Sequence, residues 1–155
     1  VLSCTQHEFR KFAKGQVLKS SFICELHLLL HFMLADVDVQ HLKTIIETSQ
    51  NLEKLTLEFL DIDGKTWQTV CESLRKNQTL QQIELAYTEK FADAYRRLTP
   101  EHRHSRTTDV IELLRANTRL TSFSWPKFQQ DESLMPEIER LLMVENNKKT
   151  SSSFP

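Results

Sequence analysis

The sequence predicts an α/β solenoid in which short parallel strands alternate with helices. One apolar phrase, with the spacing Leu-x-x-Leu-x-Leu, begins at Leu52, Leu80 and Leu120, and a looser copy begins at Ile23. The intervals between the copies are 29, 28 and 40 residues, and a helical pattern of apolar residues precedes each copy. A repeat of this length indicates a solenoid, because each unit buries its apolar face only against its neighbours.

Each phrase predicts one strand, because apolar and other residues alternate over its last positions. In the second copy, Leu55 and Leu57 are expected to point inward and Thr56 outward. The four copies place strands near 23–29, 52–58, 80–86 and 120–125. Apolar residues at helical spacing place helices near 5–18, 39–48, 65–76, 109–116 and 134–145.

Polar residues mark the expected helix boundaries. Asp63 is expected to cap the start of the third helix, and Thr108-Asp109 the start of the fourth. The joint from helix to strand repeats as Leu-x-x-Asn-x-x-Leu, around Asn77 and Asn117. We expect both asparagines to end their helices in a left-handed conformation.

These phrases and joints resemble those of leucine-rich-repeat proteins of the ribonuclease-inhibitor-like type, over residues 20–145. The resemblance implies parallel strands on a concave face, with the helices outside. It implies one domain over 1–145, with an N-terminal capping helix in 1–20, an insertion at 88–107 and a polar tail at 146–155. The C-terminal joints also resemble the tail repeats of tropomodulins, which implies a cytoskeletal, actin-capping role as an alternative.

The composition excludes several functional classes. The chain has 155 residues and a formal net charge of −1, so no global field attracts nucleic acid or an anionic membrane. Only two glycines occur, too few for a phosphate-binding or dinucleotide-binding loop. Cys4, Cys24 and Cys71 cannot all pair, which favours free thiols in a reducing, cytoplasmic compartment. No apolar run approaches the length of about 18 residues that a membrane span requires.

The long third interval predicts an insertion between Leu85 and Val110. Residues 89–98 have helical character, and Thr99-Pro100 is expected to end that helix. Basic side chains gather here and are our first candidate contact residues, namely Arg96, Arg97, His102, Arg103, His104 and Arg106. Such a rim loop could contact an acidic partner, a phosphate group or nucleic acid, or it could be a solvated loop without a role.

The concave face of the sheet is the second candidate surface. Its outward residues should align in rows across neighbouring strands, because the phrases are in register. One row would hold Glu25, Lys54, Gln82 and Ser122. The next rows would hold His27, Thr56, Glu84 and Ser124, and then Glu58 with its neighbours. Mixed polar residues on a rigid sheet suit protein recognition.

No pattern of residues supports catalysis or a metal site. A zinc site needs three or four convergent ligands, and the pairs His27 with His31 and His102 with His104 lack further ligands nearby. We expect no cofactor and no enzymatic activity, and we expect Cys24 and Cys71 to be buried.

We therefore predict a non-catalytic protein–protein interaction module, an adaptor-like part of a larger protein or assembly. It would bind a protein partner through the concave sheet face and the 89–106 insertion. Two alternatives stay open: a tropomodulin-like actin-capping domain, and contact with nucleic acid through the basic insertion.

Overall fold

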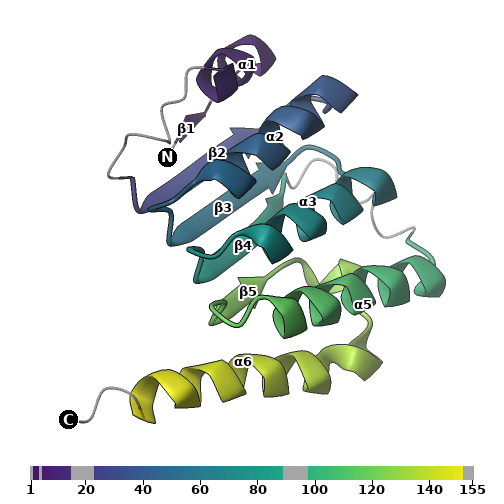
Figure 1. Ribbon diagram of the computed structural model, residues 1–155. Coiled ribbons are helices and arrows are strands. Elements are labelled where there is room, and N and C mark those ends of the chain that lie inside the picture. The colour runs from purple at the N-terminus through teal and green to yellow at the C-terminus, as the bar shows by residue number, and fades with distance from the viewer. Residues whose placement is uncertain (1, 4, 15–22, 89–97, 152–155) are drawn as a thin grey trace.

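The computed structural model describes residues 2–3, 5–14, 23–88 and 98–151, and within them it confirms an α/β solenoid (Figure 1). The part of the chain that the structure describes forms one sheet of five strands, which are all parallel to their neighbours and follow the chain order. The strands are β1 (Leu2–Ser3), β2 (Glu25–Leu30), β3 (Lys54–Phe59), β4 (Gln82–Tyr87) and β5 (Ser122–Ser124).

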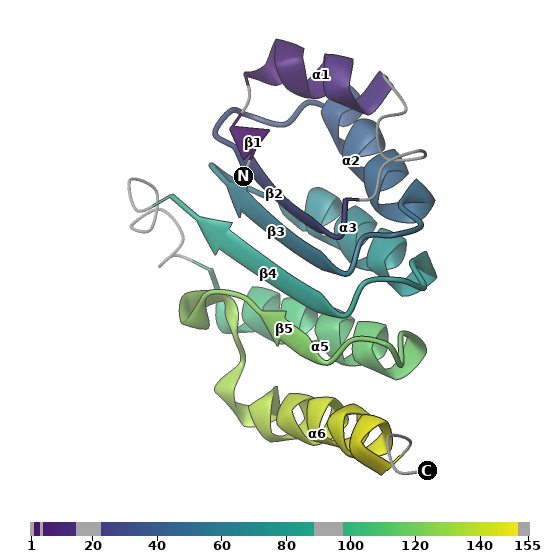
Figure 2. The ribbon, with the colours of Figure 1, turned by 90° about the vertical axis from the view of Figure 1, so that its left-hand side faces the viewer.

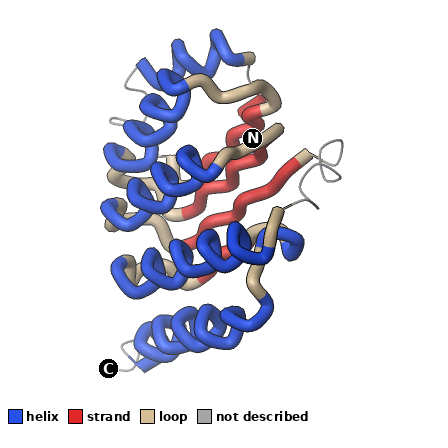
Figure 3. Tube along the Cα trace, turned by 90° about the vertical axis from the view of Figure 1, so that its right-hand side faces the viewer, coloured by secondary structure: helices blue, strands red, loops and turns tan. Residues whose placement is uncertain are grey.

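The described helices all lie on one face of this sheet, and Figure 2 shows the opposite face in front of them. Figure 3 shows the helices from their outer side. Each helix packs against the next along the solenoid, from α1 to α2, α3, α5 and α6. Their bounds are α1 (Gln6–Lys14), α2 (Asp36–Thr48), α3 (Gly64–Lys76), α5 (Pro100–Ala116) and α6 (Met135–Ser151).

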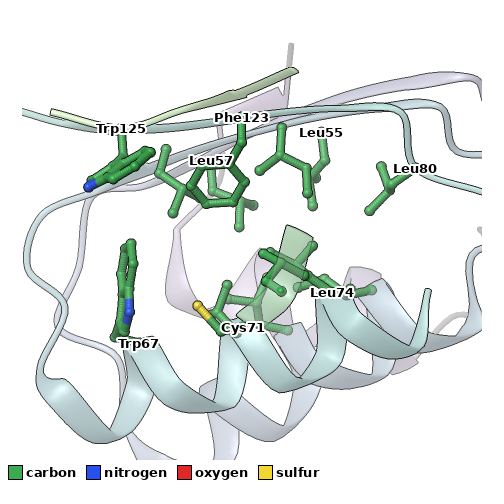
Figure 4. Packing of buried hydrophobic residues seen from close by; sticks show 14 of the residues in the cluster. Leu55, Leu57, Trp67, Cys71, Leu74, Leu80, Phe123 and Trp125 are labelled. Atoms are coloured by element: carbon green, nitrogen blue, oxygen red, sulfur yellow. The ribbon is translucent and has the colours of Figure 1, made fainter. Parts of the chain in front are cut away.

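The core lies between the sheet and the helices, where the alternating strand residues meet the apolar helix faces. Leu57 is fully buried, as are Leu28 and Leu55 on the same side of the sheet. Figure 4 shows side chains of α3 pointing toward this strand layer, with Trp67, Cys71 and Leu74 below and Leu57, Phe123 and Trp125 above. Packing between successive repeats therefore forms one continuous core.

The strands begin two residues later than the sequence predicts. Leu52, Leu80 and Leu120 open the phrases but precede β3, β4 and β5, and all three are buried. At these positions the chain is still turning from helix to strand, and the leucine side chains fill the core beneath the turn. Hydrogen bonding between neighbouring strands begins at Glu53, whose carbonyl accepts hydrogen bonds from backbone N–H groups of the next repeat.

Asn77 and Asn117 differ from the prediction in their backbone conformation. Both follow their helices with extended backbone, at φ −71° and −106°, rather than in the left-handed region. Their side chains supply the reason, because each amide bridges two repeats. Nδ2 of Asn77 donates to the carbonyl of Ile46 at 2.7 Å, and Oδ1 accepts from the backbone N–H of Leu80 at 2.8 Å. Nδ2 of Asn117 donates to the Asn77 carbonyl at 2.9 Å.

Helix α5 begins nine residues before the predicted start at 109, with Pro100 at its first position. Thr99 and Pro100 therefore begin a helix instead of ending one. The Thr99 hydroxyl accepts a hydrogen bond from the backbone N–H of His102, and a proline without an N–H is well suited to a first helical turn. Thr108 and Asp109 lie inside the helix and do not cap it.

The predicted cap of α3 by Asp63 is confirmed by a 2.7 Å hydrogen bond from the Thr66 N–H to the Asp63 carboxylate.

The C-terminal helix also exceeds its predicted bounds. Helix α6 continues to Ser151, so the predicted polar tail is helical over its described residues, 146–151. The predicted N-terminal helix is present as α1 over Gln6–Lys14, and its predicted continuation to residue 18 lies outside the described residues.

A buried carboxylate ties α1 to the rest of the solenoid. Asp38, in the first turn of α2, is completely shielded from solvent. It accepts hydrogen bonds from Arg10 Nε at 2.6 Å, from Gln6 Nε2 at 2.6 Å and from the Ala35 N–H at 3.0 Å. Burial alone would raise the pKa of Asp38, but these donors outweigh it and lower the pKa below its ordinary value of 3.8.

Acid is expected to weaken this attachment. Because the folded-state pKa of Asp38 is lowered, its stabilising effect is fully present above the unfolded value of 3.8 and is lost as the pH falls through the folded value. Urea unfolding at about pH 7 and about pH 2 should show a larger loss of stability in the wild type than in Asp38→Asn, which lacks this ionisation. Equal losses in the two proteins would contradict the assignment.

Candidate functional site

The open sheet face has the register that the sequence predicts. Glu25 pairs in register with Lys54, which pairs with Gln82 and then with Ser122. The second row is confirmed in the same way, and it consists of His27, Thr56, Glu84 and Ser124. The rows follow directly from a side-chain period of two on strands that are all in phase.

Not every residue of these rows is available to a partner. Thr56 is only 8% exposed, which corrects its assignment as a contact residue. It lies on the central strand between His27 and Glu84, and a short side chain between longer neighbours is easily covered. The carboxylate of Glu58 already contacts two histidines of the neighbouring strand region. Its Oε1 lies 2.7 Å from His31 Nε2, and its Oε2 lies 3.9 Å from His27 Nε2. The remaining row residues stay predicted contacts.

The basic residues of the predicted insertion differ in where they lie and in how exposed they are. Arg96 and Arg97 lie outside the described residues. His102 and His104 are exposed on the first turns of α5, where His104 Nδ1 lies 2.7 Å from Asp131 Oδ2. Arg103 is half-buried on the same helix. From Pro100 onward the insertion is therefore regular helix, not a loop.

Arg106 is a buried residue and not the surface contact that the sequence suggests. It is 6% exposed, and its Nη2 donates to the Ile62 carbonyl at 2.9 Å. The guanidinium lies 5.3 Å from the centre of the Trp67 ring, at cation–π distance. Spacing along α5 explains this, because Arg106 lies one turn before Val110 and so shares its buried face. One of the predicted basic contact residues is therefore buried and does not contribute its charge to the surface.

The cysteines differ in their surroundings. Cys71 is buried in the core, and this burial raises the pKa of its thiol far above the ordinary value, so it is unsuited to nucleophilic chemistry. Cys24 is exposed, which corrects the prediction that it is buried. It lies just before β2, where the chain enters the sheet. Across residues 2–3, 5–14, 23–88 and 98–151, no three metal-ligating side chains come close enough to hold an ion.

One cavity brings together residues that the sequence does not connect. It has a volume of about 510 Å³ and lies between the loop after β3, the start of α3 and the first turns of α5. Ile62, Trp67, Arg106 and Asp109 are among the residues that line it. The sequence shows Trp67 and Arg106 as separate features, and only the early start of α5 brings them together.

Two comparisons with solved structures show what this architecture is similar to. A structure of leiomodin-1 actin-binding site 2 superposes with a TM-score of 0.66 at 16% sequence identity, covering 96% of this chain and 78% of that chain. The tropomodulin C-terminal domain of Caenorhabditis elegans gives a TM-score of 0.53 at 12% identity, covering 92% and 96%. No family model and no curated protein matches the sequence.

The comparisons place the chain among leucine-rich-repeat-like α/β folds and correct our functional prediction. One neighbour is named as an actin-binding site of leiomodin-1, and the other as the C-terminal domain of a tropomodulin. These neighbours contradict the prediction of an adaptor-like interaction module with an unspecified partner, which is therefore wrong. Within the described residues, no helix is long and apolar enough to cross a membrane.

Proposed function

We propose that this chain is an actin-binding domain with a cytoskeletal role. The observation that carries the proposal is the likeness to leiomodin-1 actin-binding site 2, which extends over 96% of this chain. A likeness of this extent concerns the whole solenoid and not a single repeat. We further propose that the repeats are of the ribonuclease-inhibitor-like type, that the chain acts by binding rather than catalysis, and that it works in the cytoplasm.

The domain arrangement forms part of this proposal. We propose that residues 1–145 act as one domain and that residues 88–107 form a specialised rim. The hydrogen bonds of Asp38 to α1, and the contacts of each helix with the next, support a domain that moves as one body. A rigid body of this kind can present exposed side chains at fixed spacings, which reduces the entropy lost on binding.

Actin co-sedimentation tests the proposed function. Purified chain is mixed with increasing concentrations of filamentous actin, and the fraction in the pellet is measured after centrifugation. We expect saturable co-pelleting with an affinity on the order of micromolar, and none without actin. The Gln78→Ala variant, changed at an exposed position, serves as a matched control and should bind equally. Absence of saturable binding to filaments and to monomers would contradict the proposal.

A further inference from the structure

The chain contains a single Asn-x-Ser/Thr triplet, Asn77-Gln78-Thr79, at the joint between α3 and β4. Such a triplet, with any residue except proline in the middle, is the acceptor sequence for N-linked glycosylation in the secretory pathway. A glycan is bulky and hydrophilic, so an occupied triplet belongs on the surface of a folded protein. In this fold the acceptor side chain is instead buried, because Asn77 is 2% exposed.

The nitrogen atom that would carry the sugar is the atom by which Asn77 joins two repeats. Nδ2 donates to the carbonyl of Ile46 at 2.7 Å and to the carbonyl of Ser49 at 3.4 Å. Ile46 and Ser49 are themselves buried, as is Leu80 on the following turn. Both hydrogens of Nδ2 thus have acceptors in the preceding repeat, inside a close-packed part of the molecule.

The third residue of the triplet also has a structural role. The Thr79 hydroxyl lies 2.9 Å from the Leu52 carbonyl oxygen and 3.2 Å from Asn77 Oδ1. Asn117 forms the same kind of bridge at the next joint, but there the third residue is Arg119, so no acceptor triplet arises. The packing of the joint therefore explains the triplet at Asn77 without any role for a sugar.

We propose that Asn77 is a glycosylation acceptor that only the unfolded chain presents, and that a glycan on it prevents the solenoid from forming. An oligosaccharyltransferase forms the bond between Nδ2 and C1 of the first sugar. The bond between that carbon and the pyrophosphate of the lipid-linked donor breaks, one Nδ2 proton is released, and the lipid pyrophosphate leaves. The chain therefore folds only where it does not meet this enzyme. This gives the proposed cytoplasmic location a structural reason, and it does not depend on actin binding.

The glycan is expected to disrupt the joint in two ways. Whichever Nδ2 hydrogen the sugar replaces, the carbonyl of Ile46 or of Ser49 loses a buried hydrogen bond. The first sugar ring would also need space in a core that has none to spare. Turning the side chain outward offers no escape, because Oδ1 would then lose its 2.8 Å hydrogen bonds from the backbone N–H groups of Thr79 and Leu80.

Expression of the full chain in two compartments of the same eukaryotic cells tests the proposal. One version stays in the cytoplasm, and the other carries a signal peptide that directs it into the endoplasmic reticulum. Glycosylation is measured as a mass increase that peptide-N-glycosidase F removes, and folding as resistance to limited proteolysis. We expect the targeted chain to be glycosylated at Asn77 and sensitive to protease. Its secretion should be several-fold lower than in tunicamycin, which blocks the modification within the same oxidising compartment.

Two variants separate the glycan on Asn77 from other effects of targeting. Thr79→Val removes the triplet at nearly constant volume, and its folding is first checked in the cytoplasm. The targeted Thr79→Val chain should be unmodified and as resistant to protease as its cytoplasmic form. Adding Gly64→Asn creates a new triplet with Thr66 at an exposed position, where a Cβ atom meets no atom within 4 Å. A glycan at that position should leave the fold intact. If Thr79→Val does not fold in the cytoplasm, the tunicamycin comparison decides.

Three results would overturn the proposal. The first is a glycosylated targeted chain that resists protease as well as the cytoplasmic chain does. The second is a targeted chain that escapes glycosylation and folds. The third is a targeted chain that misfolds whether or not it is glycosylated, because the compartment and not the sugar would then be the cause. A failure of actin binding would leave all these measurements unaffected, so the two proposals can fail separately.

Discussion

Replacing Asn77 with alanine is expected to lower the free energy of unfolding by about 2–4 kcal/mol. Asn77 is 2% exposed, and its amide serves backbone groups of two repeats at once. Alanine would leave the Leu80 N–H and the Ile46 carbonyl buried without partners. Each unsatisfied buried group costs about 1–3 kcal/mol, which is a large fraction of the stability of a small domain. Urea unfolding followed by circular dichroism measures the change.

Two control variants separate the amide's role from other effects of substitution at this turn. Asn77→Asp keeps the acceptor for the Leu80 N–H but loses the donor to Ile46 and places a negative charge near that carbonyl. It should therefore be destabilised as well. Gln78→Ala changes the exposed neighbour and should alter stability by less than about 0.5 kcal/mol. If Asn77→Ala were as stable as Gln78→Ala, the bridging role of the asparagine would be refuted.

Leu57→Ala is the second substitution with a large expected effect, about 2–5 kcal/mol of unfolding free energy. Leu57 is fully buried on the central strand β3, beside Leu28 in β2 and Leu85 in β4. Truncation removes buried methyl groups and leaves a cavity that the rigid sheet fills poorly. Because neighbouring repeats share this core, the loss should appear as a lower midpoint of one cooperative transition.

The matched control for this prediction is Glu84→Ala. Glu84 lies on the adjacent strand but points to the open face, and it is exposed. Its truncation should change stability by less than about 0.5 kcal/mol. A loss below about 0.5 kcal/mol in Leu57→Ala would mean that the inner and outer faces of the sheet are wrongly assigned.

The sheet was predictable from the sequence because its determinants are local and repeated. Alternation in each phrase decides which residues face the core, and equal spacing decides the register, so the spacing alone is enough to pair Lys54 with Gln82. The Asp63 cap was predictable for a similar reason, since an aspartate before a helical pattern has few other roles there.

The insertion was harder to predict because its local signals conflict. Thr99-Pro100 suits either the end of one helix or the start of another, and the apolar pattern before it favoured the first interpretation. Arg106 was placed on the surface for the same reason, because a loop gives an arginine no buried face. The extended α5 gives it one, beneath the loop at Ile62.

The asparagine joints show a second limit of sequence reasoning. The repeated Asn marked the right place, but its action depends on carbonyls in the preceding repeat, 31 residues away in the case of Ile46. A local preference for the left-handed conformation is overruled when a side chain can satisfy several buried backbone groups from an extended backbone. Function depends even less on local pattern, since one fold supports many binding partners.

Actin binding is tested most directly by isothermal titration of the chain into monomeric actin kept from polymerising. We expect a saturable heat of binding with about one site per actin and an affinity on the order of micromolar. The Leu57→Ala variant should lose binding in proportion to the fraction unfolded, which ties the signal to the solenoid. Heats equal to those of dilution, with chain that remains folded by circular dichroism, would contradict the claim that this solenoid binds actin.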